Sequence, residues 1–287
     1  MTVRLLTAGD EAALETFLVQ HRDTSMFLRG NVRQAGLEYT GQAAGAQYVA
    51  SFDGAAVTGV AAHGWNGILL LQAPSNAAML AQSCVETSAR AVAGLIGPPD
   101  QVDAARSALR LADVATNIDA PETLFALELS NLVVPSLLSN GDVACRAPRS
   151  EERAVLYQWG FAYDMETLGA PDTAEARRRS AEFMDMRIDA GNAWVAVDRE
   201  GAVVSFSAFN ATLPDIVQLG GIYTPPALRG RGYARASVAH SLLVARERGA
   251  TRAVLFTSNP SAARAYEAVG FTRIGEYALI LFNQGRP

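Results

Sequence analysis

The sequence is poor in cysteine and histidine, the residues that most often hold metals or staple small domains. Its 287 residues include 2 cysteines and 3 histidines. Cys84 and Cys145 lie far apart, and His21, His63 and His240 show no spacing that places two of them on one helix face. We therefore expect no metal site, no disulfide scaffold, and two plain buried or half-buried thiols.

Long apolar runs and excess positive charge are also missing. Runs such as Ile68 to Leu71 are far shorter than the ~20 residues of a membrane-spanning helix, and the N-terminus lacks the apolar core of a signal peptide. A net charge of −5 with a pI near 5.3 differs from the extended basic face of a nucleic-acid-binding protein. We expect a cytoplasmic protein that binds neither membranes nor nucleic acids.

Length and composition favour two globular domains. The chain is 49% hydrophobic and 18% charged, and its length suffices for roughly two domains with separate cores. Residues 29–45 read as a polar, glycine-containing stretch before the first strands. Residues 123–129 and 132–134 read as closing or swapped strands, and residues 139–142 as a turn-rich linker.

The predicted elements repeat along the chain, which indicates an internal duplication. In each half, two strands joined by a tight turn precede a third strand that ends at a proline, and a helix, a strand and a helix follow. In the first half these elements are expected at 48–52, 56–61, 67–72, 76–89, 91–96 and 101–111. In the second half they are expected at 194–197, 202–209, 216–224, 231–248, 252–257 and 260–269.

The segment from Gln218 to Ala234, QLGGIYTPPALRGRGYA, combines a buried strand, a Pro-Pro break and a loop whose glycines open a helix. Glycine permits a tight turn and brings backbone N–H groups close to a ligand, and a helix N-terminus attracts anions. Arginines at 229, 231 and 235 add positive charge. The spacing fits neither a nucleotide P-loop nor a dinucleotide fingerprint, so the pattern predicts a cradle for a phosphate-bearing cofactor.

This loop resembles the acyl-CoA-binding motif of the GNAT superfamily of N-acetyltransferases. The resemblance lies in Arg229-Gly230-Arg231-Gly232-Tyr233-Ala234, where Arg229, Gly232 and Ala234 occupy the fixed positions. Asn259 to Phe271, NPSAARAYEAVGF, resembles the second cofactor motif of the family. The two motifs and the order of elements cover roughly one domain's worth of chain.

The resemblance implies an α/β (α+β) fold with two tandem GNAT-like domains, each a mixed, mostly antiparallel sheet flanked by helices. We expect a degenerate domain at 1–130 and a catalytic domain at 131–287. The implied co-substrate is acetyl-CoA, without a metal, and the implied reaction is direct attack of a primary amine in a ternary complex. Tyr266 takes the place of the general acid, and the cofactor-binding positions are Ile222, Tyr223, Thr224, Arg229, Gly230, Arg231, Gly232, Tyr233, Ala234 and Asn259.

Several of these residues have a second interpretation. Arg229 and Arg231 could also belong to an ordinary solvated surface, and Asn259 before Pro260 is a favourable helix N-cap. Tyr266 also has the spacing of a core aromatic. Its hydroxyl, with an ordinary pKa of about 10, suits protonation of a thiolate.

The general base is open, because the strand that enters the loop contains no acid. Many relatives carry a glutamate there. Asp215, Asp164, Glu166 or a water held by the backbone are the alternatives here. The acceptor, a small-molecule or peptide amine, and the choice between monomer and homodimer are also open.

The first half lacks the cofactor loop. After Pro74 the chain reads SNAAMLAQ, without an arginine or a glycine pair, and Ala108 aligns with Tyr266. We expect this half to serve as a scaffold or to wall the acceptor site. Arg29, Trp65 and Asn66 either contact substrate or have core and turn roles. The alternative to an enzyme is a non-catalytic acyl-CoA sensor, and retention of Tyr266 favours the enzyme.

Overall fold

The computed structural model describes residues 1–286. Internal contacts divide the chain into an N-terminal unit, formed by residues 1–123 and the strand segment that begins at Gly275, and a C-terminal unit, Leu124–Ile274. The domains expected at 1–130 and 131–287 divide the chain differently, and residue 287 lies outside the described residues.

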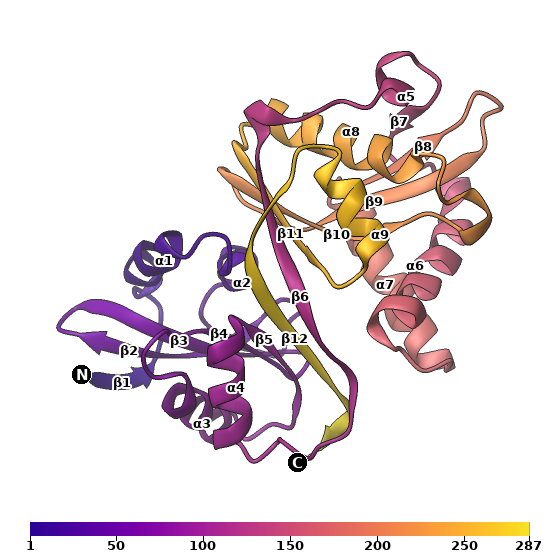
Figure 1. Cartoon of the computed structure of the whole chain (residues 1–287). Coiled ribbons are helices and arrows are strands. Elements are labelled where there is room, and N and C mark those ends of the chain that lie inside the picture. The colour runs from indigo at the N-terminus through magenta and orange to yellow at the C-terminus, as the bar shows by residue number, and fades with distance from the viewer. Residues whose placement is uncertain (287) are drawn as a thin grey trace. The chain divides into compact units, whose positions relative to one another are not determined.

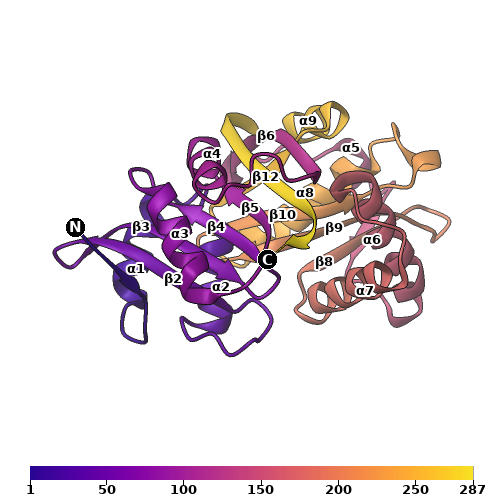
Figure 2. The same ribbon diagram turned by 90° about the horizontal axis from the view of Figure 1, so that it is seen from below.

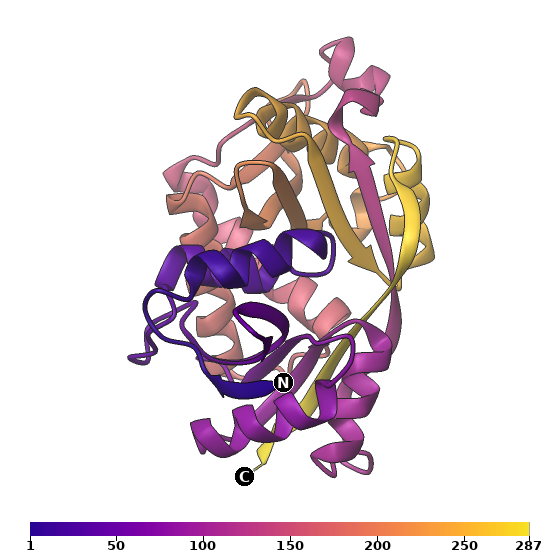
Figure 3. The same ribbon diagram turned by 90° about the vertical axis from the view of Figure 1, so that its left-hand side faces the viewer.

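The N-terminal unit consists of strands and helices in the predicted order. Its strands are β1 (Thr2–Leu5), β2 (Ala46–Asp53), β3 (Ala56–Gly64), β4 (Ile68–Gln72), β5 (Val92–Gly97) and most of β6 (Thr116–Glu128). Its helices are α1 (Glu11–Gln20), α2 (Met26–Ala35), α3 (Ala77–Ser88) and α4 (Pro99–Ala108). Figures 1 and 3 show α3 and α4 on one face of the sheet and α1 and α2 on the other.

The C-terminal unit repeats this order. Its strands are the end of β6, β7 (Ala144–Arg146), β8 (Ala193–Val197), β9 (Val203–Thr212), β10 (Ile216–Tyr223), β11 (Arg252–Thr257) and the start of β12 (Thr272–Arg286). Its α-helices are α5 (Ser136–Ser139), α6 (Arg153–Leu168), α7 (Ala174–Asp189), α8 (Tyr233–Glu247) and α9 (Pro260–Glu267). Short 3₁₀ turns lie at Leu129–Asn131, Ser150–Glu152 and Pro226–Leu228.

The pairing pattern confirms that the two halves share one topology. In the N-terminal unit β2 and β3, then β3 and β4, pair antiparallel, and β4 and β5 pair parallel. The C-terminal unit has the same order of pairings: β8 with β9 and β9 with β10 are antiparallel, and β10 with β11 is parallel. Each unit is therefore a mixed, mostly antiparallel sheet flanked by helices, as predicted.

The last strand of the chain completes the sheet of the N-terminal unit. β12 pairs antiparallel with β5, with Ala278 opposite Gly97 and Ile280 opposite Leu95. Conversely, Phe125 near the end of β6 lies in the core of the C-terminal unit. Each half thus contributes a strand to the other, which explains why the compact units differ from a single cut near residue 130.

One helix was not predicted, and one expected strand is wrong. Residues 29–45 include part of α2, which extends to Ala35 and buries Met26 and Leu28 before Gly36 ends it at a φ of +73°. Gly30 inside the helix masks its periodicity in the sequence. Residues 132–134 form no strand, and this segment instead connects a 3₁₀ turn to α5.

Two layers of apolar side chains surround the sheet of the C-terminal unit. Val217 and Leu219 of β10 pack with Val238 and Leu242 of α8 on one face. Ala208 of β9 and its neighbours pack against α6 and α7 on the other face. Figure 2 shows these two helices beside β8 and β9. Alternation along a strand therefore places Gln218, between Val217 and Leu219, on the face of α6 and α7.

Candidate functional site

β10 and β11 pair over only part of their length. Their parallel register joins residues 216–218 to residues 252–254, whereas β10 continues to Tyr223 and β11 to Thr257. The strand that enters the glycine-rich loop therefore diverges from its neighbour beyond Gln218. Such an opening exposes strand backbone to which an extended ligand can pair as an added strand.

The loop after β10 has the conformation that its glycines predict. Gly230 and Gly232 have φ values of +79° and +85°, which side chains of L-residues rarely adopt. A Cβ at Gly230 would meet no atom within 4 Å, so this point of the loop is open. Gly232 is the N-cap of α8 and provides no side-chain hydrogen bond to the first turn. The N–H groups that open α8 are therefore available for an anion.

Buried serines hold α8 against the sheet. Ser207 of β9 donates to the carbonyl of Ser237 at 3.1 Å, and the two hydroxyls lie 2.8 Å apart. Small side chains allow the helix to approach the strand closely, and both serines are fully buried. This contact fixes the helix whose first turn forms the predicted cradle.

Arg229, the first residue of the loop motif, is tied to helix α6. Its Nη2 lies 2.7 Å from Oε2 of Glu166, and its Nε donates to the carbonyl of Thr224 at 2.9 Å. The Tyr223 hydroxyl donates to Oε1 of the same glutamate at 3.0 Å. Glu166, one of the possible bases proposed from the sequence, therefore accepts hydrogen bonds from both Tyr223 and Arg229.

The other predicted cofactor residues line the strand end and the helix start. The hydroxyl of Thr224 lies 2.9 Å from Ser205 Oγ, and Ser205 donates to the carbonyl of Tyr223 at 3.1 Å. Ile222 packs on the core beneath α8. Arg231 is exposed, and the side chains of Tyr233 and Ala234 are half-buried at the start of α8.

Helix α9 contains the second predicted motif. The side-chain oxygen of Asn259 accepts from the N–H groups of Ser261 and Ala262 at 2.9 and 3.2 Å, so its N-cap role is confirmed. Tyr266 is only 8% exposed, and its ring meets Phe125 and Phe271 edge to face. Tyr266 is therefore packed as a core aromatic, and its role as general acid stays a prediction.

The three candidate bases have different surroundings. Asp215 precedes β10, at the opposite end of the strand from the loop. Glu166 is engaged by Arg229 and Tyr223. Asp164 is half-buried on α6, where burial raises the pKa of its carboxyl group against the opposing effects of Ser180 and Arg187. Asp164 is thus the candidate whose affinity for a proton is increased.

Sequence reasoning missed a group of polar side chains on the face of β10 that carries α6 and α7. Arg187 Nη2 donates to Oδ1 of Asn210 at 2.8 Å, and both lie against Gly220 and Gly221. Gln218 on the same face is 3% exposed. The only sequence signal was a single glutamine within an apolar strand.

The N-terminal unit is closed where the C-terminal unit opens. The N–H of Ala73, just after β4, donates to the side-chain oxygen of Gln101 at 2.6 Å. A Cβ at Gly97 of β5 would lie 2.7 Å from the carbonyl oxygen of Leu71, so the two strand ends lie close together. Counted from the helix starts, Ala105 of α4 corresponds to Tyr266 of α9, whereas the sequence alignment placed Ala108 there. Either alignment gives an alanine, which has no hydroxyl.

The remaining N-terminal candidates have structural contacts. Arg29 is buried and pairs with Glu15 at 2.8 Å. Asn66 accepts from the N–H of Ile68 at 3.2 Å in a turn. Cys84 and Cys145 are both free, as expected, and burial raises the pKa of each thiol to about 12.

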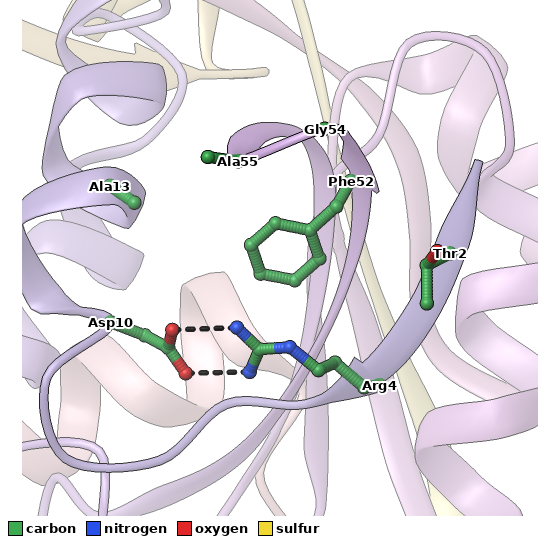
Figure 4. Close-up of a pocket in the computed structure, with 7 residues that line it drawn as sticks. All are labelled: Thr2, Arg4, Asp10, Ala13, Phe52, Gly54 and Ala55. Carbon is green, nitrogen blue, oxygen red and sulfur yellow. Dashed lines mark hydrogen bonds and ion pairs between the residues drawn. The ribbon is translucent and has the colours of Figure 1, made fainter.

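Figure 4 shows a pocket of the N-terminal unit in which Arg4 lies between Asp10 and Phe52. The guanidinium pairs with Asp10 at 2.7 Å and lies 4.3 Å from the centre of the Phe52 ring. Its charge is already balanced, so the pocket lacks an unpaired cation for an anionic ligand.

The described residues contain neither a membrane-spanning helix nor a cluster of metal-binding side chains. Within residues 1–286, no helix has the length and apolar character needed to cross a membrane. Over the same residues, no group of three or more histidine, cysteine or acidic side chains is arranged to hold a metal ion.

Comparisons with known proteins agree with these features. Residues 157–271 match the model of the acetyltransferase (GNAT) family. An acetyltransferase of Agrobacterium fabrum is 44% identical over 54 residues, which span 19% of this chain and 39% of that protein. The C-terminal unit is therefore similar to GNAT acetyltransferases over this segment.

Solved structures extend the likeness to the whole fold. A tandem GNAT protein from the clavulanic acid biosynthesis pathway aligns with a TM-score of 0.55 and 12% identity, covering 100% of this chain and 99% of that one. A GCN5-related glucosamine N-acetyltransferase region of a fungal multi-domain β-N-acetylglucosaminidase gives a TM-score of 0.59 and 16% identity over 98% of this chain, but only 38% of that chain. At these identities the likeness concerns the fold alone, and the fold is that of tandem GNAT proteins.

Proposed function

We propose that the protein is an acetyl-CoA-dependent N-acetyltransferase that acts through its C-terminal unit. The divergence of β10 from β11, directly before a helix that begins at a left-handed glycine, carries this proposal. The N-terminal unit lacks both features, which supports its proposed role as a scaffold.

The loop suits the charged end of CoA. Arg229 and Arg231 flank an open glycine, and the first turn of α8 presents N–H groups without a side-chain cap. Backbone donors and arginines together are a favourable environment for pyrophosphate oxygens. The backbone of residues 222–224 would then pair with the pantetheine arm, which would lie along the edge of β10.

The proposed reaction transfers the acetyl group directly between two bound substrates. The lone pair of a neutral primary amine forms a C–N bond with the thioester carbonyl carbon, and the C–S bond breaks. Nitrogen loses one proton and the departing sulfur gains one, so the products are an acetamide and CoA. We assign proton removal to Asp164 and proton donation to Tyr266.

A CoA-release assay with acetyl-CoA and a panel of amines tests the proposal. The panel contains amino acids, peptides, polyamines and aminoglycosides, and CoA affinity is measured separately by calorimetry. All 24 basic residues of the chain are arginines, so acetylation of its own lysines cannot contribute to the signal. Tight CoA binding without turnover of any amine would favour the sensor instead.

A matched pair of glycine variants tests the location of the cofactor site. Gly230 and Gly201 have φ values of +79° and +88°, and a Cβ at either would meet nothing within 4 Å. Gly230→Asp places a negative charge in the cradle and should weaken CoA binding about tenfold or more through like-charge repulsion. Gly201→Asp has the same backbone cost in the β8–β9 turn and should bind CoA normally. Equal affinities for both variants would place the cofactor elsewhere.

A further inference from the structure

We infer that the face of β10 beneath α6 and α7 contains an acceptor subsite for a carboxylate, with Arg187 as its anion-binding group. The acceptor would accordingly be an amine that also bears a carboxylate, such as an amino acid. This inference rests on the proposed acetyl transfer and names its acceptor class.

The subsite is built on a strand segment without side chains. A Cβ at Gly220 would lie 2.0 Å from Nδ2 of Asn210, and a Cβ at Gly221 would lie 2.9 Å from Nη1 of Arg187. Both side chains therefore rest directly on the backbone of β10, at the irregularity in its pairing with β9. Gly221 has a φ of +67°, a conformation that favours glycine here.

Arg187 carries a charge that the described protein does not balance by an ion pair. Its neighbours on α7 all pair with carboxylates: Arg177 with Asp172, and Arg178 and Arg179 with Glu175. Among the side chains that the structure describes, those of residues 1–283, the hydrogen-bond partner of Arg187 is the neutral amide of Asn210, at 2.8 Å. Loss of hydration lowers the pKa of the Arg187 guanidinium. A partly desolvated guanidinium without a carboxylate partner favours binding of an external anion.

Gln218 provides a second donor on the same face. It is 3% exposed, and its Nε2 has no hydrogen-bond partner among the described residues. It lies at the last position where β10 pairs with β11, next to the point of divergence. A buried amide donor without a partner is costly unless a ligand or water accepts its hydrogen bond.

The opposite charge lies on the neighbouring helix. Asp164 and Arg187 influence each other electrostatically, yet the described structure contains no ion pair between them. The Arg187 guanidinium suits a carboxylate, the Gln218 amide is a further donor on the same face, and the Asp164 carboxyl group suits an ammonium group. The arrangement therefore complements a zwitterion, with the amine near Asp164 and the acid group near Arg187.

Matched acceptors test this inference in the full-length protein. CoA release is measured with each proteinogenic amino acid and with its primary amide, which keeps the amine and side chain but removes the negative charge. We expect kcat/KM to favour the acids by about 10- to 100-fold, as for a hydrogen-bonded charge. Arg187→Gln should remove this preference mainly through KM, and Arg187→Lys should retain part of it. Arg178→Gln, on the same helix, should leave it unchanged.

A second readout does not depend on turnover. In the presence of CoA, N-acetyl amino acids should raise the melting temperature of the wild type more than their amides do, and Arg187→Gln should lose this difference. Amides that serve as well as acids, or a preference that persists in a folded Arg187→Gln variant, would overturn the inference. Acetylation of other amines alone would also overturn it while supporting the proposed function. Failure to bind CoA would reject the proposed function instead.

Discussion

Arg229 and Glu166 form an ion pair, with Nη2 and Oε2 2.7 Å apart, that joins the glycine-rich loop to helix α6. The same glutamate accepts a hydrogen bond from Tyr223 at the end of β10. A phosphate group that binds Arg229 must therefore compete with Glu166 or share the guanidinium with it. This contact links the glycine-rich loop to α6, a helix of the proposed acceptor side.

Removing the charge of Glu166 should strengthen CoA binding. In Glu166→Gln, Arg229 no longer faces a competing carboxylate, and since exposed pairs contribute up to about 1 kcal/mol, CoA affinity should rise by up to about fivefold. Calorimetric titration with CoA measures the change. Glu175→Gln, which disturbs an exposed pair on α7, is the control. Weaker CoA binding by Glu166→Gln would mean that Glu166 orients Arg229 for the cofactor.

Loss of the Tyr266 hydroxyl should affect chemistry and not cofactor binding. Tyr266→Phe keeps the aromatic contacts with Phe125 and Phe271, so the fold should persist. Without a proton donor for the departing sulfur, turnover should fall by about 10²- to 10⁴-fold. Steady-state kinetics together with CoA affinity separate the two effects. Unchanged turnover would show that the tyrosine is only a core residue.

Asp164 should give opposite effects on stability and on rate. Because its pKa is raised in the folded protein, its contribution to stability is present below the unfolded pKa and is lost as pH rises through the folded pKa. Asp164→Asn should therefore be more stable than the wild type at neutral pH but turn over about 10²- to 10⁴-fold more slowly. The wild-type rate should fall at low pH, where Asp164 becomes protonated and cannot accept a proton from the amine. The Asp164→Asn variant should lack this fall in rate. Urea unfolding at several pH values and pH-dependent kinetics measure both. A fall in rate at low pH that persists in Asp164→Asn would exclude Asp164 as the base.

The ion pair of Arg4 and Asp10 should stabilise the N-terminal unit above pH 3.8 and lose this effect toward pH 2. Hydrogen bonds that Arg4 donates to the Asp10 carboxylate lower the pKa of Asp10 from 3.8 to about 2. The stabilisation is therefore complete above pH 3.8 and is lost as the pH falls toward 2. Asp10→Asn should lower the urea midpoint slightly at pH 7, and the difference should shrink between pH 4 and pH 2. Asp103→Asn, an exposed residue of α4, is the comparison. A difference that does not vary with pH would indicate that Asp10 acts by another contact.

The sequence was sufficient wherever local chemistry sets the backbone. The left-handed conformations of Gly230 and Gly232, the helix that begins after them and the cap at Asn259 follow from residue type and spacing. The repeated order of strands and helices follows from the periodicity of apolar side chains. The segment after Pro74 has no glycine pair and no arginine. This local difference was enough to predict that only the second half binds the cofactor.

Tertiary structure alone decided which distant groups meet. The pairing of Arg229 with Glu166, and the seating of Arg187 and Asn210 on Gly220 and Gly221, join residues that no local pattern connects. The passage of β12 into the N-terminal unit is likewise a matter of strand pairing. Sequence determined where the chain can bend and present its N–H groups, because dihedral preferences are local. Only the fold determined which charges remain unpaired, because that depends on side chains brought together from separate elements.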